Sequence, residues 1–415
     1  MDEKAVLNHM RLLQINSTAN WGSTGKIAEQ IGILTMQQGW ESYIAYGRNV
    51  NTSRSKLIKI GSKLSVYWHL VESRLFDNHG LASRCATRKL IKQIKEIQPD
   101  IIHLHNIHGY YLNYKILFNY LNKTNIPVVW TLHDCWTFTG HCAHYISKDC
   151  KKWTTCCDKC DYKRTYPSSL LFNSAKSNFT RKRELFCGLG DRLTLVPVSK
   201  WLAEQTRQSF FGQNRINYIY NGINTEIFTP KETSEIRDKY SLNGKFVIVG
   251  VATKLNSGKG YDDYIKLREQ LSDDYIIFLV GLSDKQISSL PDGILGIQRT
   301  KNQQELADIY SMADVVLSLS RAETFGLTIA EGMACGTPAI VYNVTAVPEL
   351  ITPETGLIVD KVGDINGLVK AIEQIRSNGK EYYSAACRKH AEENFDKDKC
   401  FAKYIELYNE ILSKR

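Results

Sequence analysis

Short apolar segments alternate with amphipathic segments along the chain, and this pattern predicts an α/β fold. Apolar segments of four to six residues, separated by stretches of helical spacing, are typical of parallel strands joined by right-handed crossovers. In the first half the expected strands are 11–15, 42–46, 101–104, 128–132, 193–198 and 216–220. A helix is expected at 26–38 and another at 89–97, before Pro99, and Ser199 is well placed to cap a third.

The alternation stops at 221–233, where Asn221-Gly222 and Pro230 predict turns, and then it starts again. In the second half strands are expected at 246–251, 275–280, 314–319, 338–342 and 357–359, and a last amphipathic helix at about 397–412. The pattern therefore predicts two facing, doubly wound, Rossmann-like domains with a hinge near residue 230. Because ligands of such sheets bind beyond the carboxyl ends of the strands, we expect the site in the cleft between the halves.

The expected domain limits follow from the same pattern. They are an N-terminal, acceptor-side domain at 1–228, a C-terminal, donor-side domain at 229–395, and a helix at 396–415 that packs back across both domains. The first domain carries a cysteine-rich insert at about 135–165. A chain of 415 residues is long enough for about two cores.

Composition and charge restrict the classes of partner. Hydrophobic residues make up 43% of the chain, and no apolar run reaches the roughly 18 to 20 residues that span a bilayer, so a cytoplasmic protein is expected. No signal-peptide core begins the chain. The net charge of +10, with basic clusters in 84–95 and 159–183, suits an anionic membrane surface or solvated helix faces. Aromatic residues do not interleave with these charges, so nucleic acid is not an expected partner.

Two loops after expected strands have the composition of phosphate-binding turns. The first consists of Gly22, Ser23, Thr24 and Gly25, whose small side chains expose backbone N–H groups at the start of a helix; a plain tight turn is the alternative. The second is 252–260, in which Lys254 and Lys259 flank glycines. Cations there would stabilise the charge that grows on a departing diphosphate, although solvated surface lysines have the same appearance.

The most informative segment is 319–338, which reads L-S-R-A-E-T-F-G-L-T-I-A-E-G-M-A-C-G-T-P. Glu323 lies at the end of an expected strand and Glu331 eight positions later, so that both can accept hydrogen bonds from hydroxyls of one ligand. Gly326 allows a ligand close to the backbone, and N–H groups at the start of the following helix would face a diphosphate. The predicted donor-binding residues here are Phe325, Gly326, Leu327, Thr328 and Glu331.

This E-x₇-E segment resembles family 4 of the retaining, nucleotide-sugar-dependent glycosyltransferases, which have the GT-B fold. The segments Thr131-Leu132-His133-Asp134 and Asn221-Gly222-Ile223-Asn224 are also similar to that family. The resemblance implies that Glu323 holds the transferred sugar, Glu331 the ribose, and Lys254 and Lys259 the diphosphate. Many members have Arg where this chain has Lys254, so the two-pronged contact of a guanidinium with phosphate is lost here.

The resemblance also implies the course of the reaction. His133 would lie beside the sugar, with Asp134 placed to fix its tautomer. The family needs no metal or other cofactor for catalysis and retains the anomeric configuration by attack on the same face, without a protein nucleophile. The partners implied are a nucleotide-diphosphate sugar and an acceptor that is a glycan or is linked to polyprenyl diphosphate, with peripheral contact at the inner face of the membrane.

Eleven cysteines are present, and six lie between Cys135 and Cys160. Cys157 and Cys160 form a C-x-x-C knuckle that Cys142 and Cys150 can complete as a structural Zn²⁺ site; reduced thiols and disulfides are the alternatives. The insert is similar to the H-D-x-W-x-F-T-G-x-C insert of a family 4 subgroup linked to surface polysaccharides of the capsule, O-antigen and colanic-acid type.

The run 100–111 also resembles that subgroup, and it predicts acceptor contacts from His105, Asn106 and His108 together with Asp134. A metal held by His103 and His105 is the alternative for this run.

Two other functions fit part of the sequence. A nucleotide-sugar epimerase of the same architecture would use the phosphate loops but would need no acceptor. A nucleic-acid-binding protein with a zinc knuckle would explain the cysteines and the positive charge, but this function does not account for the Glu323–Glu331 segment.

Overall fold

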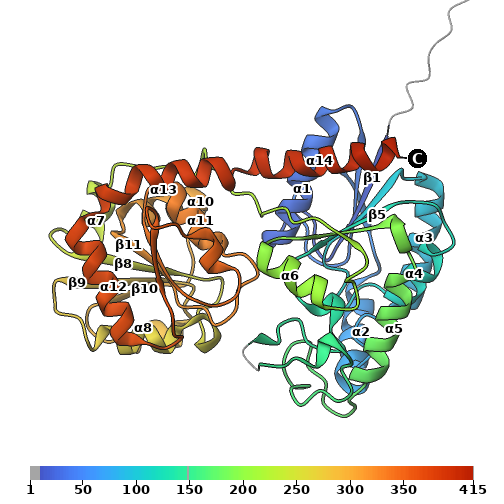
Figure 1. The fold of residues 1–415 in the computed structure, drawn as a ribbon, viewed down its shortest axis with the longest axis horizontal. Helices are drawn as coiled ribbons and strands as arrows, with labels where there is room; N and C mark the ends of the chain where they lie inside the picture. The colour runs from blue at the N-terminus through green and yellow to red at the C-terminus, as the bar shows by residue number, and fades with distance from the viewer. Residues whose placement is uncertain (1–9, 147–148, 415) are drawn as a thin grey trace, which may run out of the picture. The chain divides into compact units, whose positions relative to one another are not determined.

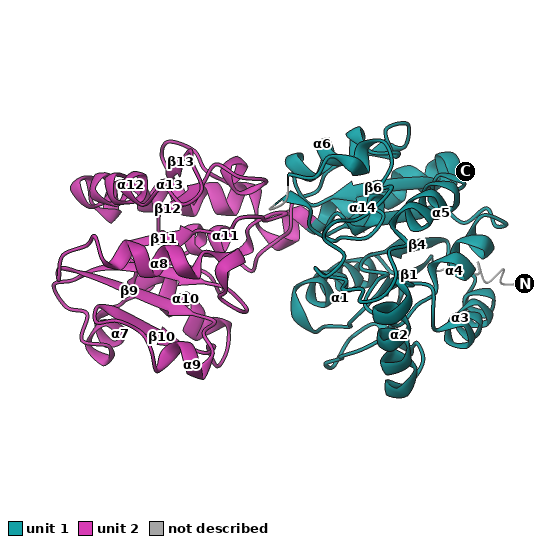
Figure 2. Cartoon of the chain, turned by 90° about the horizontal axis from the view of Figure 1, so that it is seen from below, with its two compact units in different colours: residues 1–219, 401–415 teal, residues 220–400 magenta. Residues whose placement is uncertain are grey.

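The computed structural model describes residues 10–146 and 149–414 (Figure 1). Nine residues of the start, where no signal-peptide core is expected, two residues of the cysteine insert and the last residue lie outside this range. The chain forms two compact units (Figure 2). Unit 1 comprises Met1–Ile219 and Phe401–Arg415, and unit 2 comprises Tyr220–Cys400.

Unit 1 is built on a seven-stranded sheet in the order β3-β2-β1-β4-β5-β6-β7, in which the pairs are parallel. The strands are β1 (Arg11–Asn16), β2 (Glu41–Tyr46), β3 (Lys56–Lys59), β4 (Ile101–Leu104), β5 (Val128–Leu132), β6 (Leu193–Pro197) and β7 (Arg215–Ile216). The central strands β4, β5 and β6 are buried along their whole length, which explains why they are continuous apolar runs rather than alternating ones.

Helices flank this sheet (Figure 1). They are α1 (Gly22–Gln37), α2 (Lys63–Phe76), α3 (Arg84–Ile97), α4 (Tyr114–Leu121), α5 (Ala175–Cys187) and α6 (Lys200–Gln208). The expected cap of α6 is present, because Ser199 Oγ accepts a hydrogen bond from Leu202 N at 3.1 Å. The last helix, α14 (Lys397–Ser413), begins in unit 2, and its residues from Phe401 onward belong to unit 1.

Unit 2 has a six-stranded parallel sheet in the order β10-β9-β8-β11-β12-β13. The strands are β8 (Phe246–Val251), β9 (Tyr275–Val280), β10 (Ile294–Ile297), β11 (Val315–Ser318), β12 (Ala339–Tyr342) and β13 (Gly356–Val359). The helices are α7 (Ser234–Lys239), α8 (Tyr261–Arg268), α9 (Asp284–Ile287), α10 (Gln303–Met312), α11 (Leu327–Ala334), α12 (Ile365–Asn378) and α13 (Lys380–Asn394).

The predicted fold class is confirmed, since both units are parallel-sheet, Rossmann-like α/β structures. The strand order reverses between β1 and β4 in unit 1 and between β8 and β11 in unit 2. Loops that follow these four strands lie at the topological switch points, where doubly wound sheets bind ligands. The loops singled out from the sequence are among them.

Edge strands of the two sheets differ from the sequence prediction. The strand expected at 216–220 is only Arg215–Ile216, although the N–H groups of Asn217 and Ile219 still donate to carbonyls of β6. One of those carbonyls belongs to Pro197, which has no N–H to donate in return, so the edge pairing is one-sided. The edge strands β3 and β10 were not predicted, because their short sequences have no clear alternation. In the described part of the chain no helix is long and apolar enough to cross a membrane.

Candidate functional site

In unit 2, Lys259 and Glu323 are brought together although 64 residues separate them. Lys259 ends the turn after β8 and Glu323 follows β11, and Nζ of Lys259 forms an ion pair with Oε1 of Glu323. The same Oε1 accepts a hydrogen bond from Ser320 Oγ at 2.9 Å, and the backbone N–H of Glu323 donates to Thr345 Oγ1 at 2.9 Å. The carboxylate is therefore fixed from two sides at the carboxyl edge of the sheet.

Arg321 holds the two loops against each other, a role that the sequence reading did not assign. One guanidinium nitrogen lies 3.2 Å from both carboxylate oxygens of Asp263, which is buried at the start of α8. The backbone N–H of Arg321 donates to Gly258 O at 3.0 Å. Gly260 has φ +79°, and a Cβ there would lie 2.4 Å from Leu319, so only glycine permits this approach. The Arg321–Asp263 pair thus sets the position of Lys259.

The start of α11 has the form of an anion site. Gly326 precedes the helix with φ +111°, and the first amide that bonds back to it is that of Ile329. The amides of Leu327 and Thr328 therefore belong to the first turn, whose N–H groups point out of the helix end. Glu331 lies one turn further and accepts a hydrogen bond from Tyr310 OH at 3.2 Å. The side chain of Phe325, by contrast, is buried between Tyr220 and Phe395.

In unit 1 the glycine-rich loop after β1 is the first turn of α1 itself, since the helix begins at Gly22 rather than at the expected Lys26. Gly22 and Ser23 are exposed, and the helix start has no side-chain cap. Gly25 is buried, and a Cβ there would lie 2.7 Å from Thr18 Oγ1. An uncapped, glycine-containing helix start of this kind can receive an anion.

A chain of hydrogen bonds links three neighbouring strands of unit 1 to His133, which follows β5. Gln14 of β1 donates from its amide nitrogen to Ala28 O at 2.7 Å, which turns its Oε1 toward His105 Nε2 at 3.1 Å. Nδ1 of His105 lies 3.2 Å from Nε2 of His133. Gln14 Oε1 is an acceptor, so neutral His105 carries its proton on Nε2. Its Nδ1 is then an acceptor, and the donor in the bond between His105 and His133 is Nε2–H of His133. The lone pair of neutral His133 is then on Nδ1.

Burial keeps these imidazoles neutral. It lowers the pKa of His133 to about 4, with the nearby Asp134 opposing the shift and His108 adding to it. Burial, and then the neighbouring His103 and His133, lower the pKa of His105 well below its usual value. At neutral pH the His133 imidazole is therefore uncharged.

His103 extends the network to the C-terminal helix. Its Nε2 lies 2.8 Å from Thr131 Oγ1 and its Nδ1 lies 2.6 Å from the hydroxyl of Tyr408, while Tyr404 OH reaches the same Thr131 oxygen at 2.9 Å. His103 is fully buried. Both ring nitrogens thus have protein partners, and this arrangement gives His103 a structural position in the core.

The residues predicted to contact an acceptor occupy different environments. His105 and His108 are 1% and 7% exposed, and Asn106 is half-buried. Asp134 accepts a hydrogen bond from Trp136 N at 2.9 Å and pairs with His108 Nε2 at 2.8 Å, whereas Nε2 of His133 bonds His105. Burial acts to raise the pKa of Asp134, but His108, His144 and the N–H of Trp136 together outweigh it, so the net shift of this pKa is downward.

The cysteine insert encloses a small cavity of about 30 Å³, a volume that fits one ion or water. Its lining includes His141, Cys142, Cys150, Cys157 and Cys160. All described cysteines are free thiols, so the disulfide alternative is wrong for this structure. Burial, followed by the neighbouring thiols, raises the pKa of Cys142 to about 12. Among the described residues, no three His, Cys, Asp or Glu side chains already surround one point as the ligands of a metal do.

Two protein-family descriptions match the chain. Residues 37–227 match "Glycosyltransferase Family 4" and residues 232–393 match "Glycosyl transferases group 1". Among curated proteins, the chain is 24% identical to the "Putative colanic acid biosynthesis glycosyl transferase WcaC" of Escherichia coli (strain K12). That alignment covers 85% of this chain and 88% of the relative.

Solved structures of low sequence identity share the fold. Sucrose-phosphate synthase from Thermosynechococcus elongatus superposes with a TM-score of 0.73 at 16% identity, covering 98% of this chain and 100% of that one. Alr3699/HepE of Anabaena in complex with UDP superposes with a TM-score of 0.68 at 14% identity, covering 97% and 100%.

Proposed function

Because the chain belongs to the family 4 glycosyltransferases, we propose that it is a retaining enzyme that transfers a sugar from a nucleotide-diphosphate sugar to a glycan or lipid-linked acceptor in polysaccharide biosynthesis. The observation that carries the proposal is the Lys259–Glu323 pair beside the open first turn of α11. A cation, a carboxylate and outward-pointing amides on one sheet edge suit the diphosphate and hydroxyl groups of such a donor. The complex of Alr3699/HepE with UDP makes a UDP-sugar the first donor to test.

In the proposed reaction an acceptor hydroxyl oxygen attacks the anomeric carbon on the face from which the diphosphate departs. The new C–O bond forms as the bond from the anomeric carbon to the diphosphate oxygen breaks, and the hydroxyl proton passes to that oxygen. Glu323 would hold sugar hydroxyls, Glu331 the ribose, and Lys254, Lys259 and the α11 amides the diphosphate. Neutral His133 would contact the sugar, and no protein group forms a covalent bond to it.

Nucleotide binding tests the donor site directly. We expect one of UDP-, GDP-, ADP- or TDP-glucose to raise the unfolding midpoint of the chain, with about 2.7 kcal/mol of stabilisation at a hundredfold excess over Kd. Glu331→Ala should abolish the response, and Glu393→Ala, which removes an exposed carboxylate on α13, should keep it. If no nucleotide stabilises the wild type, or if both variants respond equally, the donor assignment is wrong. Sugar transfer to an acceptor, rather than interconversion of the donor, distinguishes a transferase from an epimerase.

A lipid-linked acceptor requires the enzyme to work at a membrane, and α2 has an exposed apolar face suited to that. Leu64, Tyr67 and Trp68 are 65%, 59% and 61% exposed, and their spacing places them on one side of the helix. Near the end of α2, the N–H of Leu170 donates a hydrogen bond to Arg74 O at 2.7 Å. This bond places segment 170–172, whose side chains are also exposed, against α2. Aromatic and aliphatic side chains accompanied by basic residues favour an anionic lipid surface.

Vesicle binding tests this surface. The full chain should bind vesicles that contain phosphatidylglycerol more tightly than pure phosphatidylcholine vesicles, and less tightly as salt rises. Replacing both Leu64 and Trp68 with serine should weaken binding at least about tenfold, since each large apolar side chain contributes up to about 1.5–3 kcal/mol when buried. Tyr382→Ser, at a 69% exposed position on α13, is the matched control. Equal binding by the double variant and the wild type would reject the α2 surface.

The cysteine insert is proposed to hold a structural Zn²⁺ and no catalytic metal. Support comes from four free thiols on the wall of one cavity and from the preference of Zn²⁺ for thiolate ligands. Zn²⁺ binding would release the thiol protons. It would also stabilise the insert, whose described regular structure includes the short 3₁₀ turns Trp136–Phe138 and Lys152–Thr154. The metal content of the purified full chain measures this.

A further inference from the structure

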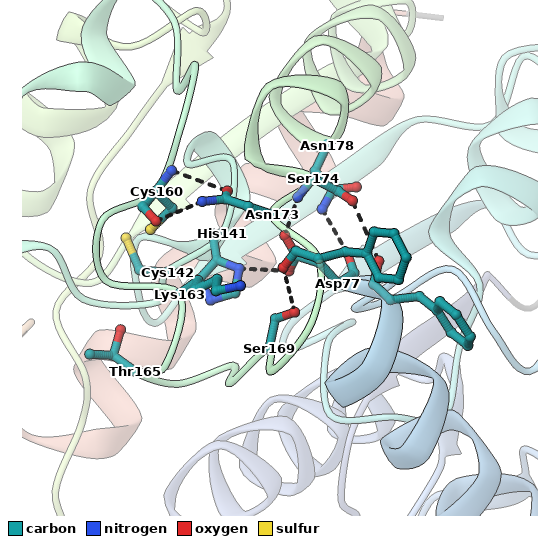
Figure 3. Close-up of polar contacts among 12 residues, drawn as sticks. Asp77, His141, Cys142, Cys160, Lys163, Thr165, Ser169, Asn173, Ser174 and Asn178 are labelled. Atoms are coloured by element: carbon teal, nitrogen blue, oxygen red, sulfur yellow. Dashed lines mark hydrogen bonds and ion pairs between the residues drawn. The ribbon is translucent and has the colours of Figure 1, made fainter.

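His141 has a ring nitrogen that the protein leaves without a partner. Its Nδ1 lies 2.7 Å from Oδ1 of Asp77, and both side chains are 1% exposed (Figure 3). Nε2 of the same ring is buried and has no hydrogen-bond partner. An unsatisfied buried nitrogen costs about 1–3 kcal/mol, so its presence needs an explanation.

The surroundings of Asp77 fix the orientation and tautomer of this ring. Oδ2 of Asp77 accepts the backbone N–H of Ser174 at 2.7 Å, and its carbonyl accepts from the amide of Asn178 at 2.9 Å (Figure 3). A carboxylate only accepts, so Nδ1 of His141 carries a proton, and in the neutral imidazole Nε2 presents a lone pair. A carboxylate that holds one histidine nitrogen while the other binds a metal is the usual outer arrangement of zinc-bound histidine.

His141 directly precedes Cys142 in the sequence, and both residues line the cavity of the cysteine insert. Cys160 is held in turn by Asn173, which accepts its N–H at 3.1 Å and donates to its carbonyl at 2.8 Å. Asn173 directly precedes Ser174, which bonds Asp77. One hydrogen-bonded frame therefore carries the imidazole and the knuckle cysteine (Figure 3).

We propose that His141 Nε2, oriented by Asp77, is a ligand of the metal ion in the insert, and that three of the four cysteines complete a tetrahedral set. This inference rests on the proposed zinc site but changes its composition, since the sequence predicts four thiolates and assigns His141 no role. Zn²⁺ accepts one imidazole and three thiolates as readily as four thiolates. Bound Zn²⁺ would be the partner that Nε2 of His141 lacks, and it would bring this nitrogen and the cysteine sulfurs of the cavity wall closer together.

The test uses the purified full chain and X-ray absorption at the zinc edge. We expect about one zinc per chain, with a nitrogen shell at about 2.0–2.1 Å beside the sulfur shell at about 2.3 Å. A sulfur-only shell would overturn the role of His141 while leaving the zinc site intact. A chain that contains no zinc, and takes up neither Zn²⁺ nor Co²⁺ after reduction, would overturn both proposals.

Variants separate a ligand from a structural histidine. His141→Ala should weaken Zn²⁺ binding in chelator competition, and Asp77→Asn should weaken it about 10–100-fold. His144→Ala, at an exposed position on the same cavity, should not change it. In case His141→Ala does not fold, His141→Cys should restore the metal, with the Co²⁺ absorption bands moving to those of a tetrathiolate. Wild-type affinity in His141→Ala, or an unchanged Co²⁺ spectrum in His141→Cys, would refute the inference. One of the four Cys→Ser variants should keep the metal, and loss in all four would also refute it.

Discussion

Replacing Lys259 with alanine is expected to lower kcat about 10²–10³-fold, the usual effect of removing one preorganised group that stabilises charge in a transition state. The ammonium group of Lys259 is paired with Glu323 at the sheet edge. In the proposed reaction it also faces the diphosphate, whose charge grows as the sugar leaves. An interaction that strengthens toward the transition state affects kcat more than KM. Steady-state kinetics with a nucleotide-sugar donor measures both constants.

Two further variants determine whether the effect comes from this position. Lys266→Ala removes a lysine of the same charge that is exposed on the neighbouring helix α8, and it should leave kcat unchanged. Lys259→Arg keeps the charge but changes its geometry, and it should recover part of the activity. If Lys266→Ala lowers kcat as strongly as Lys259→Ala, the effect is one of general charge, and the assignment of Lys259 fails.

Acidification below about pH 6.5 is expected to destabilise unit 1 steeply. Burial lowers the pKa of His69 to about 3 and holds the pKa values of His79, His103 and His105 well below the usual value. The unfolded chain takes up these protons near about pH 6.5, while the folded chain does not. The free energy of unfolding therefore has its full value above about pH 6.5 and decreases as the pH falls from there to the pKa values of the folded state. Each histidine contributes up to about 1.4 kcal/mol per pH unit, so four together rival the whole stability of a domain within about two units.

The two units provide an internal control for this prediction. The only described histidine of unit 2 is His390, and nine of the ten histidines belong to unit 1. Hydrogen exchange between pH 7 and 5, corrected for intrinsic rates, should therefore show protection lost in unit 1 peptides before unit 2 peptides. His69→Gln should flatten the pH slope by one proton, because Nε2 of His69 accepts the Gly80 N–H and cannot do so when protonated. Parallel loss of protection in both units would contradict the prediction.

The fold was largely predictable from the sequence because parallel strands buried on both faces leave continuous apolar runs. The strands at 101–104, 128–132, 246–251 and 275–280 have the predicted bounds. The elements that were missed depend on tertiary contacts. Leu64, Tyr67 and Trp68 give α2 an apolar stripe that faces solvent, so its pattern does not indicate a core helix.

The loops of the proposed donor site were predictable for a similar reason, since glycines, lysines and carboxylates after strands are visible in the sequence. Their connections were not. Arg321 stands inside the segment that was singled out, but its partner Asp263 lies 58 residues away. Gln14 orients His105 across 91 residues and has no sequence signal beyond being a polar residue in an apolar strand. A polar residue within an apolar strand is the only sequence feature that indicates a buried hydrogen-bond network of this kind.

The position of α14 has a consequence for synthesis on the ribosome. Unit 2 is continuous in sequence, so its residues are synthesised in one uninterrupted stretch. Unit 1 is not, because Tyr404 and Tyr408, which bond Thr131 and His103 in its core, are synthesised only after the whole of unit 2. The N-terminal part of unit 1 therefore has an incomplete polar core until α14 has been synthesised, and a stop codon shortly before residue 404 would damage the unit whose synthesis began first.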